Sequence, residues 1–154
     1  MARDLPQRAE NPFTTNTAVL LREAFVTLNG LVVPRLAAHG FPDVRPAHNA
    51  VFQYLDAEGT TVSTLAERAE MTKQAMGELV AHLEEHGYVD RVPDPADRRA
   101  KLVRPTAKGR KVYAVVRELI PELEQQLVEV LGATRVQQLR RDLRTIQETF
   151  ATRD

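Results

Sequence analysis

The sequence contains no cysteine, and this absence excludes disulfide bonds, thiolate zinc sites and thiol-based oxidation switches within the chain. Long apolar runs are lacking as well. The longest uninterrupted aliphatic stretch covers residues 18–21, far short of the ~20 residues that cross a bilayer. The first residues, MARDLPQRAENPF, are too polar for a signal peptide. We therefore expect a cytoplasmic protein that has no membrane partner.

A charge excess of one sign is also missing, because 21 Lys and Arg residues balance 21 Asp and Glu residues. Net charge therefore does not indicate a nucleic-acid partner, and any basic surface must be local. The chain has 154 residues, of which 43% are hydrophobic and 27% are charged. This composition predicts one soluble globular domain with its own core.

The residue spacings that are typical of enzymes do not occur. We find no nucleophile beside a base, no carboxylate pair and no phosphate-cradling glycine loop, so we expect neither an enzyme nor a cofactor. Among the four histidines, His82 and His86 are four positions apart and could share a helix face. Two ligands are too few for a zinc site, so we expect no metal.

Residues 1–12 are polar, include two prolines and show no periodicity, which predicts a mobile N-terminal arm. Apolar residues then recur at helical spacing from Thr14 or Thr17. We expect Pro34 to kink this first helix and Gly40 to end it.

The middle of the chain has three shorter helical patterns, the first of which begins at Pro46. The next is predicted to be capped by Ser63 or Thr64. The third is predicted to be capped by Thr72 and to end at Gly87. Two short helices that are joined by a tight polar turn indicate a helix-turn-helix.

Two β-like runs follow, at residues 88–92 and 100–104, and the loop 93–99 separates them. They predict a β-hairpin, and a hairpin after a helix-turn-helix is a wing. Between Tyr88 and Lys111 there are eight Lys or Arg residues against three Asp residues, a local charge of +5 in a chain of zero net charge.

From Thr106 onward, two long helical patterns close the chain, with a kink expected at Pro121. The last helix is predicted from Thr134, because Gln137 completes a capping-box pattern. Its apolar positions form a regular stripe: Val136, Leu139, Leu143, Ile146 and Phe150. Such a stripe is compatible with ordinary core packing. The long terminal helices nevertheless carry more apolar surface than a small winged unit covers, which favours a helical dimer interface.

The segment from Thr61 to Gly109 resembles the MarR family of winged helix-turn-helix regulators. It matches the family's wing motif at Asp97, Arg99, Val103 and Thr106. Pro105 departs from that motif, since an aliphatic residue is usual there, and we expect the second wing strand to fray at this proline.

The resemblance implies a mainly α fold with a small β-hairpin wing, arranged as a winged helix-turn-helix in an α-helical homodimer. Residues 13–154 would form one domain, with the winged unit at about 46–106 and dimerisation helices at about 14–39 and 107–152. The implied function is a transcriptional regulator, expected to be a repressor. It would bind a pseudo-palindromic operator in double-stranded DNA and respond to a small ligand.

The predicted DNA contacts lie on two elements. The helix that begins at Lys73 would enter the major groove, and the wing would meet the adjacent minor groove. By the family pattern Arg99 is the minor-groove residue, with its guanidinium oriented by the Asp97 carboxylate. Glu78 is expected to pair with a nearby cation. The predicted DNA-binding residues are Thr72, Lys73, Gln74, Gly77, Asp97, Arg98, Arg99 and Lys101. The alternative is a solvated helix turn and a solvated hairpin.

A ligand crevice is expected near the bend between the first two helices. The residues predicted to bind there are Arg22, Phe25, His48 and Phe52, which offer a cation, a histidine and aromatic faces. This chemistry suits a small aromatic anion, although each residue could equally serve ordinary packing. The competing function is a dimeric winged-helix adaptor that does not bind DNA. The operator, the ligand and the regulated genes are not specified by the sequence.

Overall fold

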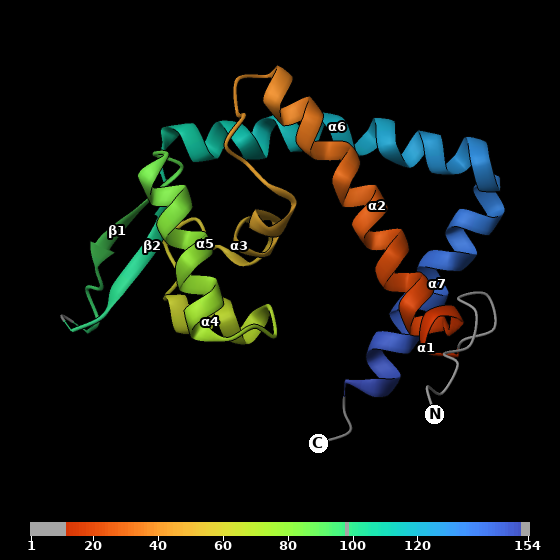
Figure 1. Cartoon of the computed structure of the whole chain (residues 1–154), viewed down its shortest axis with the longest axis horizontal. Helices are drawn as coiled ribbons and strands as arrows, with labels where there is room; N and C mark the ends of the chain where they lie inside the picture. The colour runs from red at the N-terminus through yellow and green to blue at the C-terminus, as the bar shows by residue number, and fades with distance from the viewer. Residues whose placement is uncertain (1–11, 98, 152–154) are drawn as a thin grey trace, which may run out of the picture. The chain divides into compact units, whose positions relative to one another are not determined.

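The computed structural model describes residues 12–97 and 99–151, and Figure 1 shows its elements. They fall into two compact units, of which the first ends at Val116 and the second begins at Arg117. The elements are α1 (Pro12–Thr15), α2 (Thr17–Ala38), the 3-10 helix η1 (Pro46–His48), α3 (Asn49–Tyr54), α4 (Val62–Arg68), α5 (Lys73–Glu85), β1 (Val89–Pro93), β2 (Lys101–Pro105), α6 (Ala107–Leu131) and α7 (Ala133–Phe150).

The predicted N-terminal arm lies almost wholly outside the described residues, since it covers residues 1–12 and the description begins at Pro12. Pro12 itself begins α1, so the arm as predicted is one residue too long. Helix α2 starts at Thr17, which is one of the two predicted starts. Its cap is Asn16, whose side chain accepts a hydrogen bond from the Val19 backbone N–H at 3.1 Å.

Helix α2 is apolar around much of its circumference. Leu36 is buried, whereas Leu20, Phe25, Val26 and Leu31 are between 43% and 56% exposed. By length and composition alone, residues 13–38 could also cross a membrane, a property that core helices of soluble proteins share. The core of one chain covers only one face of such a helix, so its other apolar faces remain open to a further protein surface. This is compatible with the predicted dimer interface.

The helix-turn-helix consists of α4 and α5. The predicted cap of α4 is wrong, because Thr61 and not Ser63 or Thr64 accepts the first backbone N–H, that of Thr64 at 3.1 Å. Thr64 serves instead as the third helical residue, and its hydroxyl contacts that of Thr61. Thr72 caps α5 as predicted and accepts from the Ala75 N–H at 3.1 Å.

The predicted end of α5 is confirmed at Gly87, which has a φ of 74°. The N–H of Tyr88 then donates to the Leu83 carbonyl at 2.8 Å, which closes the helix end. The turn between α4 and α5 contains Glu70 with a φ of 52°, the one non-glycine residue of positive φ in the described chain.

The wing is the antiparallel pair β1 and β2, and each strand begins one residue later than predicted. Pro105 is buried and pairs with Val89, so the predicted fraying is wrong. The Thr106 N–H donates to the Tyr88 carbonyl at 3.0 Å in the next pair along the ladder. Because donors alternate sides along a strand, the nitrogen of Pro105 faces away from β1 and no ladder hydrogen bond is lost.

The core of the first unit gathers side chains from α2 to the start of α6. Its buried members are Leu36, Phe41, Val44, Val51, Leu55, Leu65, Ala66, Met76, Val80, Leu83, Tyr88, Val89, Val103 and Val112. Three of the predicted core positions of α5, namely Met76, Val80 and Leu83, are fully buried. One face of helix α5 therefore packs in the core, and the opposite face is exposed to solvent.

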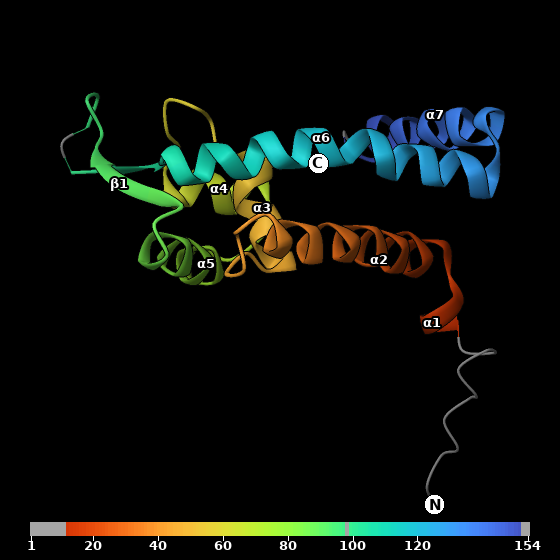
Figure 2. The same ribbon diagram turned by 90° about the horizontal axis from the view of Figure 1, so that it is seen from above.

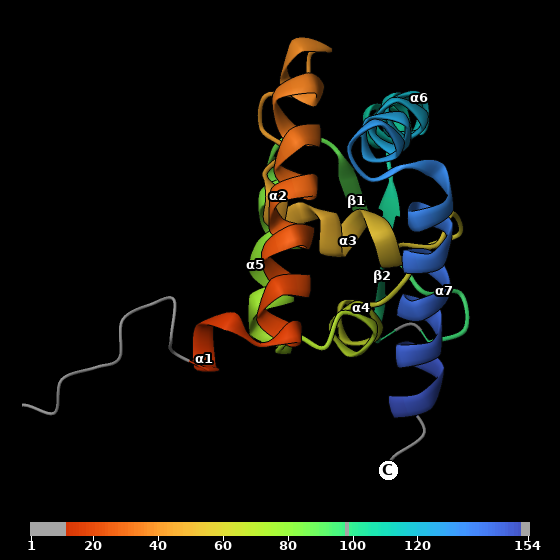
Figure 3. The same ribbon diagram turned by 90° about the vertical axis from the view of Figure 1, so that its right-hand side faces the viewer.

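The second unit comprises the later part of α6 and all of α7, and Figure 3 shows α7 leaving the end of α6 at a steep angle. The predicted cap at Thr134 is wrong. Gly132, with a φ of 86°, ends α6 and also precedes the first residue of α7, so the turn needs no side-chain cap. An ion pair between Arg140 and Glu124 joins the two helices. Helix α6 continues through Pro121.

Candidate DNA interface and adjoining pocket

The N-terminal turn of α5 presents the predicted base-contacting residues to solvent. Lys73 and Gln74 are exposed, and Thr72 uses its hydroxyl oxygen as the helix cap. The Gln74 amide donates to the Glu78 carboxylate at 3.4 Å. Glu78 therefore contacts an amide rather than the predicted cation. Because this hydrogen bond is long and exposed, the Gln74 amide can exchange it for another partner at little cost.

Gly77 lies one turn further along α5 and is half-buried. A Cβ built at Gly77 would meet nothing within 4 Å, so no contact inside the described protein requires a glycine there. Glycine in a helix interior costs roughly 1 kcal/mol relative to alanine. Alanine would therefore fit at this position within the described fold.

The loop of the wing is shaped by two carboxylates. Asp97 accepts a hydrogen bond from the backbone N–H of Arg99 at 2.9 Å, and Asp94 accepts from that of Ala96 at 2.8 Å. The Asp97 carboxylate thus binds the backbone of Arg99, whereas the sequence predicted that it binds the guanidinium. It fixes the loop and leaves the exposed Arg99 side chain at its tip.

Two other predicted wing residues complete this set. Lys101 is exposed at the first position of β2. Arg98 lies outside the described residues. Figures 1 and 2 both show the wing beside α5, with its tip extending beyond that helix.

One contact that the sequence did not reveal ties the wing to α5. Arg91 of β1 forms an ion pair with Glu84 of α5, with 3.2 Å between Nε and Oε2. Both side chains are partly exposed, so the pair adds at most about 1 kcal/mol to stability. Its geometric effect is to link the two elements that carry the predicted DNA contacts.

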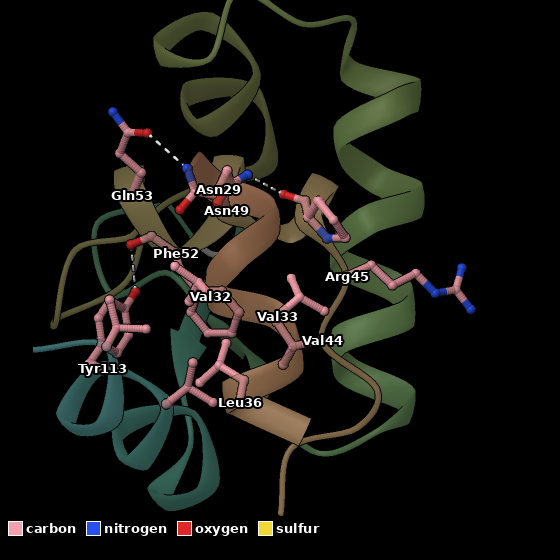
Figure 4. Close-up of a pocket in the computed structure, with 13 residues that line it drawn as sticks. Asn29, Val32, Val33, Leu36, Val44, Arg45, Asn49, Phe52, Gln53 and Tyr113 are labelled. Atoms are coloured by element: carbon pink, nitrogen blue, oxygen red, sulfur yellow. Dashed lines mark hydrogen bonds between the residues drawn. The ribbon is translucent and has the colours of Figure 1, made fainter. Parts of the chain in front are cut away.

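A pocket of about 290 Å³ lies in the first unit and is shown in Figure 4. Its walls are mainly apolar side chains from α2, α3 and α6, with a few polar groups between them. The lining residues are Asn29, Val32, Val33, Leu36, Val44, Arg45, Pro46, Asn49, Phe52, Gln53, Val112, Tyr113 and Val116. Apolar walls with few polar groups are typical of small-molecule sites.

Several polar groups of the pocket are already hydrogen-bonded. The Tyr113 hydroxyl donates to the Phe52 carbonyl at 2.8 Å, and burial raises the pKa of Tyr113 to about 12. The Asn29 amide donates to the Pro46 carbonyl at 3.1 Å, and the Asn49 amide donates to Gln53 at 3.4 Å. Arg45 lines the rim, and Figure 4 shows its guanidinium directed away from the pocket.

Of the four predicted ligand residues, the structure brings only Phe52 to this pocket. His48 is buried next to it without lining it. Arg22 and Phe25 are exposed on α2, before the first pocket residue of that helix. Arg45 and Tyr113 were missed, because Tyr113 is far from Phe52 in sequence and Arg45 lies in a loop without periodicity.

Comparison with known proteins gives consistent matches. A model of the MarR family matches residues 43–100. The transcriptional regulator HosA of Escherichia coli O111:H- is 38% identical over 77 residues, which cover 49% of this chain and 57% of that protein. HosA of E. coli O127:H6 (strain E2348/69 / EPEC) is 32% identical over 96 residues, which cover 62% of this chain and 71% of that protein.

Among solved structures, CouR of Rhodococcus jostii RHA1 bound to p-coumaroyl-CoA has a TM-score of 0.66 and 27% identity. The match covers 86% of this chain and 92% of that one. The chain therefore spans a little over half of the first HosA protein and most of the CouR structure.

Proposed function

Because this chain belongs to the MarR family of transcriptional regulators, we propose that it is a ligand-responsive repressor which binds a pseudo-palindromic operator as a homodimer. The observation that carries this proposal is the pairing of two exposed elements in one compact unit. Lys73 and Gln74 begin a helix whose other face is buried, and the wing beside it presents Arg99. The ion pair between Glu84 and Arg91 links these elements.

The first element suits the major groove of B-DNA. An α-helix fits that groove, and the residues of its first turns reach the base edges. Gln74 can form a bidentate pair with adenine, and Lys73 can reach guanine or a phosphate. Gly77 allows the helix backbone to approach the DNA closely.

The second element suits the adjacent minor groove, where a narrow and negative trough attracts an inserted guanidinium. Arg99 is the residue assigned to it, with Arg98 and Lys101 beside it in sequence for phosphate contacts. The local +5 charge between residues 88 and 111 supports DNA rather than the alternative adaptor function, which the zero net charge would otherwise favour.

The homodimer is proposed from apolar surface that the single chain leaves exposed. It occurs on α2, at Leu20, Phe25 and Val26, and on α7, at Leu139 and Ile146. Exposed apolar surface of this extent marks an interaction site, and a two-fold dimer presents two recognition helices to two half-sites. Phe25, and Arg22 next to it on α2, also remain predictions for ligand binding.

The ligand is proposed to be a small aromatic anion that occupies the pocket. Its volume of about 290 Å³ is at the small end of ligand pockets, which run from roughly 300 to 1,000 Å³. Phe52 offers an aromatic face, and Arg45 is a cation at the rim that can turn toward an anionic group. The relative CouR, which binds p-coumaroyl-CoA, supports an aromatic ligand.

The experiment that tests this function is selection of bound fragments from genomic DNA, followed by a mobility-shift assay at modest salt. We expect one enriched motif with two half-sites about one DNA turn apart. Gln74→Ala should weaken binding to the best fragment by about 1–3 kcal/mol and relax one base position. Absence of any enriched motif would favour the adaptor function, and salicylate-like compounds that leave a preformed complex intact would contradict the ligand assignment.

A further inference from the structure

Three histidine rings form a stack in the first unit, which runs from the buried His48 to the partly exposed His82 and His86. His48 of η1 lies against His82 of α5, with 4.8 Å between ring centroids, and His82 lies against His86, with 4.2 Å between centroids. Each pair is tilted by only 25°. We call these three residues the histidine column. It joins the recognition helix α5 to the segment that forms one wall of the pocket, because Arg45 and Asn49 on either side of His48 both line that pocket.

At its buried end, the column favours neutral rings. His48 is 1% exposed, and its Nδ1 accepts a hydrogen bond from the Arg45 backbone N–H at 2.9 Å, so this nitrogen carries no proton. His82 has a buried Nδ1 with no hydrogen-bond partner among the described residues. A proton placed on either Nδ1 would break the first contact or add an unpaired buried charge.

The charged groups around the column come from several elements. Asp43, in the loop after α2, lies 3.6 Å from His86 Nε2 and 3.8 Å from the Lys108 ammonium of α6. That ammonium also donates to the His86 carbonyl at 2.8 Å, and the Tyr88 hydroxyl donates to Asp43 at 3.2 Å. The one carboxylate beside His86 is therefore shared with two other donors.

Burial lowers the pKa of His48 to about 4, and the neighbouring His82, Arg45 and His86 act in the same direction. The pKa of His82 is also lowered, first by burial and then by Arg45 and His86, against the opposing charges of Glu85 and Asp43. The closed column thus resists protonation at its buried end, where no carboxylate of the described residues acts on His48.

We propose that the histidine column is a proton-sensitive link between the pocket wall and α5, which holds the recognition helix in its DNA-binding position only while His48 and His82 are neutral. This proposal rests on the proposed function. Stacked rings this close cannot both carry a positive charge in a buried site, so proton uptake requires them to separate. Separation moves η1 and the pocket wall away from α5.

The direction of the pH effect follows from linkage. A histidine whose pKa is depressed in the closed form binds a proton more readily once the column opens. Above the ordinary histidine pKa of 6.5, proton binding therefore does not favour opening. As the pH falls from 6.5 toward about 4, the closed form becomes progressively less stable relative to the open form. Each proton gained on opening shifts that equilibrium about tenfold per pH unit. General electrostatics acts in the opposite direction, because added positive charge strengthens DNA binding.

The test measures the affinity of the full-length protein for its selected genomic DNA fragment from about pH 7.5 to about pH 5.5, at constant ionic strength. We expect the dissociation constant of the unmodified protein to rise over this range, by up to about tenfold for each proton gained on opening. His82→Phe keeps an aromatic ring in the stack, and no described residue forms a hydrogen bond with the His82 Nδ1 that it removes. This variant should therefore bind DNA normally at neutral pH, and its DNA affinity should lose most of its dependence on pH. The matched control is His39→Phe, since His39 is exposed and outside the column, and its acid response should equal that of the unmodified protein.

Hydrogen exchange of the α5 amides provides a second readout that needs no variant and no DNA. After correction for the intrinsic rate, opening of α5 should increase about tenfold per pH unit below 6.5. Constant or tighter DNA binding at the acid end, equal acid sensitivity in His82→Phe, or pH-independent α5 opening would each overturn the link. Operator affinity that does not change with pH would contradict the link but not the regulator function. Absence of operator binding at every pH would contradict the regulator function, and the hydrogen-exchange measurement would then test the link by itself.

Discussion

At the residue scale, two glycines of the first unit are under opposite constraints. A Cβ at Gly109 would overlap the Tyr88 carbonyl oxygen, which belongs to the backbone and cannot rotate away. The N–H of Gly109 also donates to the Thr106 hydroxyl at 3.1 Å, and that hydroxyl in turn donates to the Gly87 carbonyl at 2.7 Å. The first turn of α6 is thus pressed against the end of α5. Gly77, by contrast, has open space around it.

Gly109→Ala should destabilise the protein, because the added methyl group forces α6 away from the Tyr88 backbone and breaks the Thr106 contacts. Overpacking of this kind costs about 1–3 kcal/mol. Urea unfolding followed by circular dichroism measures the change, with Gly77→Ala as the control of identical chemistry. Equal unfolding midpoints for Gly109→Ala and the unmodified protein would show that the contact yields without cost.

Gly77→Ala should have the opposite effects on stability and on binding. The free energy of unfolding should rise by about 1 kcal/mol, because alanine is the better helix former and its methyl group meets no neighbour. Operator affinity should fall, because the methyl group would stand between α5 and the DNA. Unfolding and anisotropy titrations on the same preparation test both effects. Unchanged affinity in the stabilised variant would remove Gly77 from the interface.

At the scale of elements, the wing and α5 are each held by the core at one end and exposed at the other. Helix α5 is held by Met76, Val80 and Leu83 in the core, and its first turn is exposed. The wing is held at its base by the Val89–Pro105 pair and by the bridge from Thr60 to Val103, and its tip is exposed. Base identity is read in the major groove and groove width in the minor groove, so substitutions in the two elements should have different signatures.

Arg99→Ala should weaken operator binding strongly and erase any preference for A·T-rich flanks, while the central base preferences remain. A minor-groove arginine responds to groove width more than to base identity. Binding to a panel of operators with A·T-rich or G·C-rich flanks measures this loss. Arg104→Ala is the control, since Arg104 is an exposed arginine of the same strand pair but lies near the base of the wing. Full affinity in Arg99→Ala would count against the minor-groove assignment.

At the scale of the whole molecule, the exposed apolar side chains proposed for the dimer interface occur in both units, whereas the proposed DNA contacts all lie in the first. The first unit carries α5, the wing and the pocket, and its α2 exposes apolar side chains. The second unit carries the stripe of α7, in which Val136 is buried while Leu139 and Ile146 are each 40% exposed. A stripe of this regularity is the expected mark of a helix interface between two copies of the chain.

Leu139→Glu combined with Ile146→Glu should convert the dimer to a monomer and reduce operator affinity by several orders of magnitude, because one subunit then binds one half-site alone. Sedimentation equilibrium measures the association state. Gln137→Glu, at an exposed position on the opposite face of α7, serves as the control for added charge. A doubly substituted protein that remains dimeric would place the interface elsewhere.

Much of the local structure was determined by the sequence itself, because caps, helix ends and strand alternation depend on neighbours within a few residues. Thr72, Gly87 and the two wing strands follow from such signals and were confirmed, the strands with a shift of one residue. The two wrong caps are also local errors. The cap of α4 is Thr61 instead of Ser63 or Thr64, and the residue before α7 is Gly132 instead of Thr134, each within three residues of the prediction.

The tertiary structure alone decided which side chains line the pocket and which form the histidine column. The hydrogen bond from Tyr113 to Phe52 spans 61 positions, and that from Tyr88 to Asp43 spans 45. His48 reaches His82 through the packing of η1 against α5, so no pattern in the sequence groups these two rings. Contacts of this range leave no periodicity in a single sequence, because they depend on how whole elements pack and not on the spacing of residues within one element.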